Sequence, residues 1–163
     1  MTNFAALIHT LTDAGVEYIL VGGVAATVHG SARLTRDVDV VYARTPANME
    51  RLVSALAPHA PYLRGAPPGL PFSWDERTVS RGLNFTLTTA LGDLDLLGEI
   101  TGGGGFDQLL PRSHRVEIFE RGVLCLDLPS LISVKRAAGR PRDLEAVAVL
   151  EAIAEERARR NRI

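Results

Sequence analysis

Residues 18–43 read "YILVGGVAATVHGSARLTRDVDVVYA", and much of the fold can be worked out from this segment. An apolar strand runs into two glycines, a short run of small residues typical of a helix follows, and the segment ends in an alternating strand. Side chains two positions apart on a strand point to the same face. Asp37 and Asp39 therefore share one side of the last strand, while Val38 and Val40 can enter the core.

The two aspartates form an acidic pair on an otherwise apolar strand. Their carboxylates lie about 7 Å apart along a strand that rises ~3.3 Å per residue, so they can converge on one centre. Without a counter-charge they repel, and one is driven toward protonation. A divalent cation removes this repulsion, and a few hard oxygen ligands suit Mg²⁺, which also binds nucleotide phosphates. The plainer alternative is that Asp37 and Asp39 protect a sheet edge from aggregation.

A second acidic pair repeats the pattern in "LGDLDLLGE", residues 91–99. Asp93 and Asp95 share one face of a predicted strand over 93–97, and the intervening leucines share the other. If this strand lies beside 37–42, a third carboxylate reaches the same cations. Two metal ions held by three carboxylates can serve in-line displacement at phosphorus, and a carboxylate can also act as general base. Alternatively, Asp93 after a glycine is ordinary hairpin chemistry.

Gly22 and Gly23 stand between the first strand and the helix. Glycine permits positive φ and close backbone approach, and the N–H groups at a helix start can hold a phosphate. The pair is neither a P-loop, since no Gly-Lys-Ser/Thr follows, nor a G-x-G-x-x-G fingerprint. Alone it marks only a tight turn, but followed by a helix and an Asp-x-Asp strand it is a much narrower signal.

The whole chain alternates helices and strands before a strand-rich middle and two final helices. We expect helices near 4–14, 24–29, 46–56, 129–138 and from 142 onward, strands at 17–21, 37–42, 83–90 and 93–97, and a hairpin of 114–119 with 123–128 turning at Arg121-Gly122. Prolines make 58–74 a loop or lid, and 102–105 a flexible glycine loop. This order favours a mixed α+β fold, a mixed β-sheet covered by helices on one face.

Composition limits the classes of protein. A chain of 163 residues suits one domain, residues 1–163, with a hydrophobic core. The net charge of −1 gives no overall attraction to nucleic acid or membrane. The single cysteine, Cys125, rules out an internal disulfide and favours a cytoplasmic location. No apolar run reaches the roughly 20 residues that a membrane span needs.

The motifs together resemble the signature of the DNA polymerase β-like nucleotidyltransferase superfamily. The match consists of Gly22-Gly23, thirteen residues, Asp37-Val38-Asp39 and the later Leu94-Asp95-Leu96. The fuller string is similar to small nucleotidyltransferase-like proteins that include relatives of the abortive-infection toxins of type IV toxin–antitoxin systems. The segment "LISVKRAAGRPRDLEAVAVL", residues 131–150, is similar to their Lys…Arg-x-Lys/Arg-Asp region. No motif that we can place covers residues 58–82.

The resemblance implies a minimal nucleotidyltransferase fold, two Mg²⁺ ions and transfer of NMP from an NTP. By position, Asp37 and Asp39 would bind the metals, and Asp95, in preference to Asp93, would complete the catalytic set. The remaining positions would serve the nucleotide: Gly22 and Gly23 would hold the triphosphate, and Arg33 and Thr35 would support the phosphates or brace the loop.

Lys135 and Asp143 are a further candidate pair for nucleotide binding. Lys135 is the one lysine among 18 basic residues. On an unbroken helix the two would share a face, but Gly139 and Pro141 interrupt it, so their meeting depends on the turn. Lys135 could neutralise triphosphate charge, and Asp143 could pair with it or with Arg142. The alternative is an ordinary surface salt bridge.

These observations favour a Mg²⁺-dependent nucleotidyltransferase whose acceptor hydroxyl is on RNA or tRNA, a protein or a small molecule. The toxin-like resemblance implies tRNA or protein as acceptor and an antitoxin partner. An antibiotic nucleotidyltransferase is a variant, although residues 58–82 show no acidic acceptor pocket. The alternative class is a non-catalytic nucleotide-binding or protein-interaction module. We rank it lower, because all three carboxylates are present.

Overall fold

The computed structural model describes residues 1–162. Two short 3₁₀ turns, at Ala57–His59 and Leu110–Arg112, accompany the regular elements. In chain order these are α1 (Phe4–Asp13), β1 (Tyr18–Val21), α2 (Gly22–Val28), β2 (Asp37–Tyr42), α3 (Pro46–Leu56), β3 (Tyr62–Leu63), α4 (Glu76–Arg81), β4 (Phe85–Thr89), β5 (Gly92–Leu97), β6 (Glu99–Ile100), β7 (Gly104–Gly105), α5 (Phe106–Leu109), β8 (Ser113–Ile118), β9 (Arg121–Leu126), α6 (Leu128–Ala138) and α7 (Pro141–Arg160).

Local signals in the sequence account for the helix ends. Thr45 caps α3 by accepting a hydrogen bond from the backbone N–H of Asn48, and Pro46 occupies the first turn. Asp127 caps α6 in the same way through the N–H of Ser130. At the other end of α6, Gly139 takes a left-handed conformation with φ of 69°. These ends confirm the expected division of residues 129–160 into two helices.

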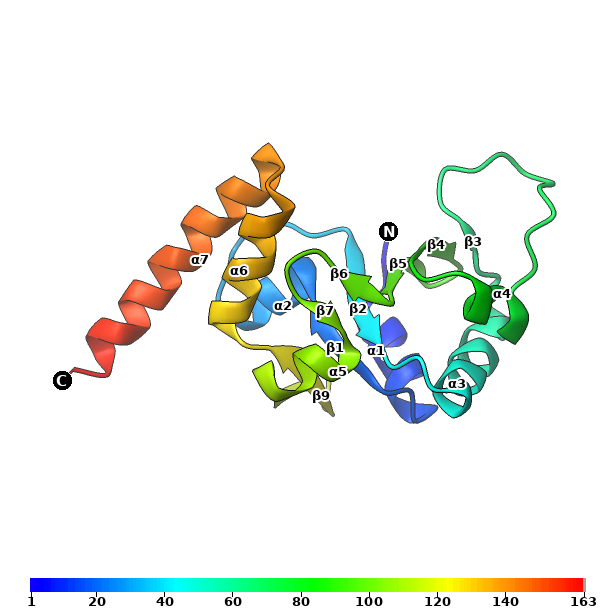
Figure 1. The fold of residues 1–163 in the computed structure, drawn as a ribbon, viewed down its shortest axis with the longest axis horizontal. Coiled ribbons are helices and arrows are strands. Elements are labelled where there is room, and N and C mark those ends of the chain that lie inside the picture. Colours follow the sequence, from blue (N-terminus) through cyan, green and yellow to red (C-terminus); the bar gives the residue numbers. More distant parts are fainter. Residues whose placement is uncertain (163) are drawn as a thin grey trace.

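A seven-stranded sheet with the order β3-β4-β5-β2-β1-β9-β8 forms the centre of the molecule (Figure 1). It is mixed, because β2 pairs with β5 and β1 with β9 in parallel, while the other neighbours are antiparallel. In the β2–β5 pair, Asp37 lies opposite Asp93, and Asp39 lies opposite Asp95. The expected α+β class with a mixed sheet is confirmed, and the two acidic strands are neighbours.

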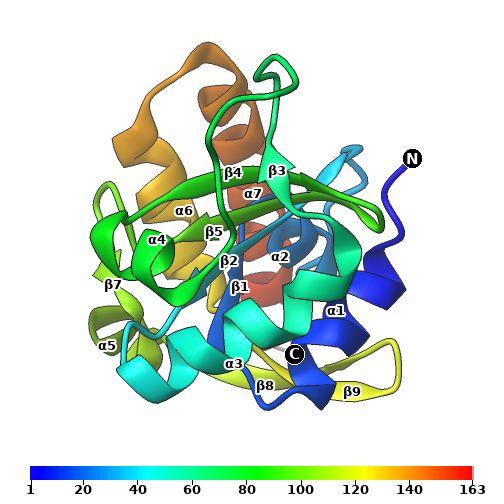
Figure 2. The same cartoon turned by 90° about the vertical axis from the view of Figure 1, so that its right-hand side faces the viewer.

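Helices cover both faces of the sheet, so the expected covering of one face was too simple. Helices α1 and α3 lie on one side, and α2, α6 and α7 on the other (Figure 1, Figure 2). The reason is that β1 and β2 bury apolar side chains in both directions. Leu20 pairs with Val40 on one face and Ile19 with Val41 on the other, and all four are fully buried. A strand buried on both faces needs cover on both faces.

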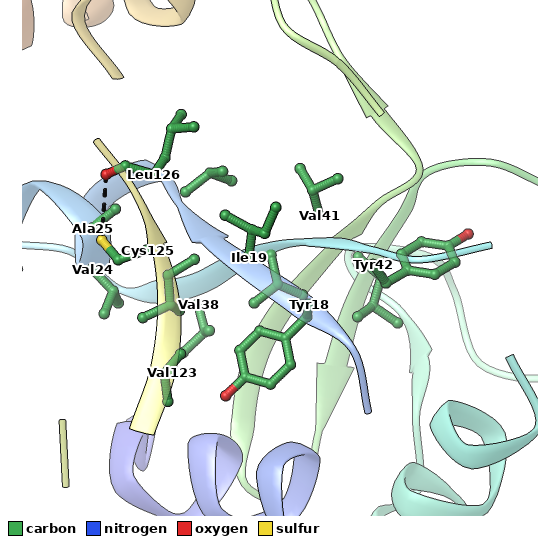
Figure 3. Packing of buried hydrophobic residues seen from close by; sticks show 14 of the residues in the cluster. Tyr18, Ile19, Val24, Ala25, Val38, Val41, Tyr42, Val123, Cys125 and Leu126 are labelled. Atoms are coloured by element: carbon green, nitrogen blue, oxygen red, sulfur yellow. Dashed lines mark hydrogen bonds between the residues drawn. The ribbon is translucent and has the colours of Figure 1, made fainter. Parts of the chain in front are cut away.

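The hydrophobic core extends across the sheet as one cluster. Figure 3 shows part of it, with labelled side chains that come from β1, β2 and β9 and from the small helix α2. Cys125, the single cysteine, is buried in this cluster, where its thiol contacts the carbonyl oxygen of Leu126 at 3.5 Å. Burial raises the pKa of the Cys125 thiol to about 11, so it is a packing residue rather than a nucleophile.

Three local expectations need correction. The proline-rich stretch 58–74 contains the two-residue edge strand β3, because Tyr62-Leu63 fits between prolines that an edge tolerates. The glycine loop 102–105 contributes β7, which pairs with β6. The β8–β9 hairpin turns at Phe119 and Glu120, both with positive φ, rather than at Arg121-Gly122.

Within residues 1–162, no helix combines the length and apolar composition that crossing a membrane requires.

Candidate active site

Three carboxylates from two neighbouring strands converge at the edge of a pocket. Asp37, Asp39 and Asp95 each offer an oxygen, and these oxygens lie within 4.8 Å of one another. The parallel register between β2 and β5 produces this convergence, because it places both acidic pairs on one face and side by side. Asp93 shares that face but stands outside the group of three. Within residues 1–162, no other three acidic, histidine or cysteine side chains meet in this way.

The electrostatics of the group call for a cation. Burial, followed by the charges of Asp37 and Asp95, raises the pKa of Asp39 to about 8. Burial and the neighbouring Asp95 also raise the pKa of Asp37. A divalent cation favours the ionised form of a carboxylate whose pKa is raised by burial and by like-charged neighbours. Three hard oxygen donors around one space fit Mg²⁺, which keeps its remaining positions for water and phosphate oxygens.

The two glycines form the first turn of α2, directly against the carboxylates. A Cβ at Gly22 would lie 1.9 Å from Oδ2 of Asp39, and Gly22 also has φ of +67°. A Cβ at Gly23 would lie 2.4 Å from Oγ1 of Thr35. The backbone of β1 and α2 can approach β2 this closely because neither residue has a side chain. The start of α2 therefore lies against Asp39 at Gly22 and against Thr35 at Gly23.

Thr35 and Arg33 belong to the segment that connects α2 to β2. The Thr35 hydroxyl donates a hydrogen bond to the carbonyl of Asp37 at 3.1 Å, so it braces the start of the acidic strand. Arg33 makes an ion pair with Glu145 of α7 at 3.6 Å. Both side chains are partly exposed, and such a pair contributes little to stability. Arg33 is therefore held near the pocket by a weak contact that a ligand can replace.

Lys135 and Asp143 meet across the turn between α6 and α7. Their Nζ and Oδ1 atoms are 3.8 Å apart, and Arg140 contacts the other oxygen of Asp143 through Nε at 2.6 Å. The Asp143 side chain is only 2% exposed. Burial alone would raise the pKa of Asp143, but the hydrogen bond and charge of Arg140 and the charge of Lys135 outweigh it, so the pKa is lowered. Asp143 thus anchors two basic side chains.

We expect Asp143→Asn to lower the free energy of unfolding by about 1–2 kcal/mol at pH 7, because the substitution removes a charged hydrogen-bond acceptor from a buried position. The pKa of Asp143 is depressed in the folded protein, so its contribution is present above the unfolded pKa of ~3.9 and is lost as pH falls. Denaturant unfolding at pH 7 measures the loss of stability, and the same experiment at pH 3 shows whether the difference from wild type disappears. Glu145→Gln is the control on the same helix, and equal stabilities of Asp143→Asn and wild type at pH 7 would contradict the anchoring role.

All nine residues predicted from the sequence line one open pocket of about 740 Å³. The glycines, the 31–36 segment and the acidic strands form one part of its wall, and the α6–α7 turn forms another. The pocket is large enough for a nucleotide and part of an acceptor. The predicted residues are therefore neighbours in space: Gly22, Gly23, Arg33, Thr35, Asp37, Asp39, Asp95, Lys135 and Asp143.

Sequence reasoning missed Arg64, which also lines the pocket. Its guanidinium lies among the carboxylates, with nitrogen–oxygen distances of 2.8 Å to Asp95, 3.5 Å to Asp93 and 3.6 Å to Asp37. Arg64 directly follows the two-residue strand β3 inside the proline-rich stretch. No motif marks this position, and so short a strand has no periodicity to read.

Comparisons with known proteins give a structural likeness only. Neither the protein-family models nor the curated proteins gave a match. A lincosamide antibiotic adenylyltransferase, LnuA, solved with lincomycin, matches with a TM-score of 0.61 and 15% identity, over 93% of this chain and 96% of that one. ANT(2")-Ia, solved with adenylyl-2"-tobramycin, matches with a TM-score of 0.55 and 16% identity, over 99% of both chains. The chain therefore has the fold of these nucleotidyltransferases.

Proposed function

We propose that this chain, as a single domain over residues 1–163, is a Mg²⁺-dependent nucleotidyltransferase that transfers NMP from an NTP to an acceptor hydroxyl. One observation carries the proposal. The parallel β2–β5 register brings Asp37, Asp39 and Asp95 within 4.8 Å of one another, on a fold shared with nucleotidyltransferases. Gly22 lets the backbone at the start of α2 approach Asp39 closely. A module that only recognised protein would not need a half-buried acidic group of this kind.

In the proposed reaction, the acceptor oxygen forms a bond to the α-phosphorus of the NTP. The bond from that phosphorus to the bridging oxygen breaks, and pyrophosphate leaves. Asp37, Asp39 and Asp95 hold the metal ions, which when bound activate the hydroxyl and neutralise charge on the phosphates. Asp95 takes the proton of the acceptor hydroxyl. The backbone N–H groups of Gly22 and Gly23 bind the triphosphate.

The basic side chains of the pocket complete the nucleotide site in this proposal. Lys135 is 21% exposed at the pocket wall and is oriented by Asp143, so it can meet the β- and γ-phosphates. Arg33 can exchange its weak contact with Glu145 for a phosphate. Each such charge-assisted contact is worth more than the surface ion pair that it replaces. Asp143 then acts as a positioning residue rather than as a ligand.

For the acceptor we propose a hydroxyl of RNA, with tRNA first, or of a protein. Arginines of the pocket wall favour an anionic or extended acceptor: Arg33, Arg36, Arg140 and Arg142. Under this proposal the chain acts in the cytoplasm as the toxin of a toxin–antitoxin pair. The second candidate is an antibiotic nucleotidyltransferase, which the likeness to LnuA and ANT(2")-Ia favours.

The test is an acceptor screen with all four α-³²P-labelled NTPs and Mg²⁺. Parallel reactions contain total tRNA, lysate protein, lincomycin or tobramycin. We expect label in one acceptor class, and loss of the label with EDTA and with Asp37→Asn. Label in an antibiotic alone would select the second candidate. No labelled product in any reaction would overturn catalysis, and calorimetric titration with NTP and Mg²⁺ would then establish whether the chain is a nucleotide-binding module.

A further inference from the structure

Arg64 extends a polar row that crosses the three strands β4, β5 and β2. Its backbone N–H donates to the carbonyl of Thr86 on β4 at 2.9 Å. Thr86 lies opposite Asp95 on β5, and Asp95 lies opposite Asp39 on β2. The Arg64 side chain therefore reaches over β4 toward the acidic cluster. Its Nη2 also donates to the carbonyl of Leu87 at 2.7 Å, which holds the guanidinium against the edge of the sheet.

The guanidinium lies against the oxygens that the proposed function assigns to metal ions. Its nitrogens contact carboxylates of both acidic pairs, with distances between 2.8 and 3.6 Å. Arg64 is the basic residue that contacts both strands of the cluster among the ion pairs of residues 1–162. A single positive charge thus replaces part of the charge that divalent cations would supply.

The fit of this guanidinium to the carboxylates is incomplete. Only the contact with Asp95 is short, and it is not oriented as a hydrogen bond. Nε of Arg64 and Oδ1 of Asp95 are both buried and lack a hydrogen bond. Unsatisfied buried polar atoms are costly, and a hard cation would satisfy the Asp95 oxygen directly. The contact therefore has the properties of one that a better ligand displaces.

We propose that Arg64 is a resident counter-ion of the acidic cluster, which competes with the divalent cation and leaves the carboxylates when the cation binds. This inference rests on the proposed function, because it concerns the same metal site. The backbone hydrogen bond to Thr86 keeps β3 in place, so only the side chain needs to move. Arg64 thereby keeps the three aspartates that it contacts, Asp37, Asp93 and Asp95, together before loading and limits the affinity for free metal.

The experiment measures Mn²⁺ binding without nucleotide, by electron paramagnetic resonance of the free ion. A unit charge about 4 Å from a divalent ion changes its affinity about thirtyfold at the dielectric constant of water, and screening by salt brings the expected effect closer to fivefold. We therefore expect Arg64→Gln to lower the Kd for Mn²⁺ at least about fivefold. Arg64→Lys, which keeps the charge, should stay close to wild type. Arg77→Gln removes an exposed charge of α4 outside the pocket and should change nothing.

The outcomes separate this inference from the proposed function. An unchanged or higher Kd in Arg64→Gln, with Mn²⁺ binding lost in Asp39→Asn, overturns the role of Arg64 alone. If all Mn²⁺ remains free in the presence of the wild type and of Arg64→Gln, neither protein binds the ion. That result overturns the metal site, and the inference about Arg64 falls with it. If Arg64→Gln does not fold, an NMR measurement on the wild-type protein still tests the inference. We expect the Nε–Hε NMR signal of Arg64 to shift on addition of Mg²⁺, and an unmoved signal with Mg²⁺ bound overturns displacement.

Discussion

Under the proposed function, Asp39→Asn is expected to slow nucleotidyl transfer strongly and, at the same time, to stabilise the protein without metal at pH 8. Asparagine cannot supply the negative charge that the cation site needs, so we expect kcat to fall roughly 10²–10³-fold or more. The matched control is Asp93→Asn, on the same face but outside the group of three, and its loss should be much smaller. Equal losses in the two variants would contradict the assignment of Asp39.

The gain in stability follows from the raised pKa of Asp39. Its pKa is about 8 in the folded protein and close to 3.8 without the fold, mainly because of burial. Between these values the folded state binds a proton that the unfolded state has lost, so stability falls as pH rises from 4 to 8. Asparagine does not ionise, so Asp39→Asn removes the cost of holding a carboxylate at this position. With EDTA at pH 8 we expect a rise in Tm of roughly 2–8 °C, shrinking toward pH 4. A pH-independent difference would contradict this origin.

Gly22→Ala is expected to inactivate the protein as completely as loss of the carboxylate does. The added Cβ would lie 1.9 Å from Oδ2 of Asp39, so that carboxylate must move. A left-handed conformation costs a non-glycine residue about 1–2 kcal/mol in addition. We therefore expect loss of transfer, loss of Mn²⁺ binding and a lower free energy of unfolding, measured by the label assay, by electron paramagnetic resonance and by denaturant titration.

Gly15→Ala is the control that separates the cost of backbone strain from the cost of a Cβ placed against Asp39. Gly15 has φ of +75°, close to that of Gly22, but its nearest neighbour would be 3.8 Å from the new Cβ. This variant should lose a similar strain energy and keep both transfer and metal binding. If Gly15→Ala and Gly22→Ala lose the same stability and Gly22→Ala remains active, contact with Asp39 is not what requires glycine at position 22.

The acidic cluster could be found from the sequence because its signal is periodic. Asp37 and Asp39 are two apart on one strand, and Asp93 and Asp95 repeat the spacing on another. Those spacings, with the glycine pair, predict that the carboxylates share a face. They do not predict the register between the strands, which makes Asp95 rather than Asp93 a member of the group of three. The preference for Asp95 came from the family resemblance.

Other features depend on long-range contacts that no local pattern encodes. Arg64 reaches the carboxylates only because β3 joins β4, and neither the prolines around it nor its own type predicts this. Phe119 and Glu120 form a turn at positive φ although neither is glycine. Because glycine is typical of hairpin turns, the nearby Gly122 led to a predicted turn at Arg121-Gly122. The helices on both faces were predictable in part, since "YILV" is apolar without alternation, as a strand buried on both sides requires.

The parallel pairing of β2 with β5 has a consequence for the order in which the chain folds. Asp39 and Asp95 are 56 positions apart, and parallel pairs between such distant segments form slowly. The two strands also bring like charges together, which opposes their docking. A cation cannot drive the folding of this chain as zinc does in a zinc finger, because no local segment brings all three carboxylates together. Under the proposed function, the polypeptide must therefore complete its β-scaffold first and acquire its metal ions as a late event.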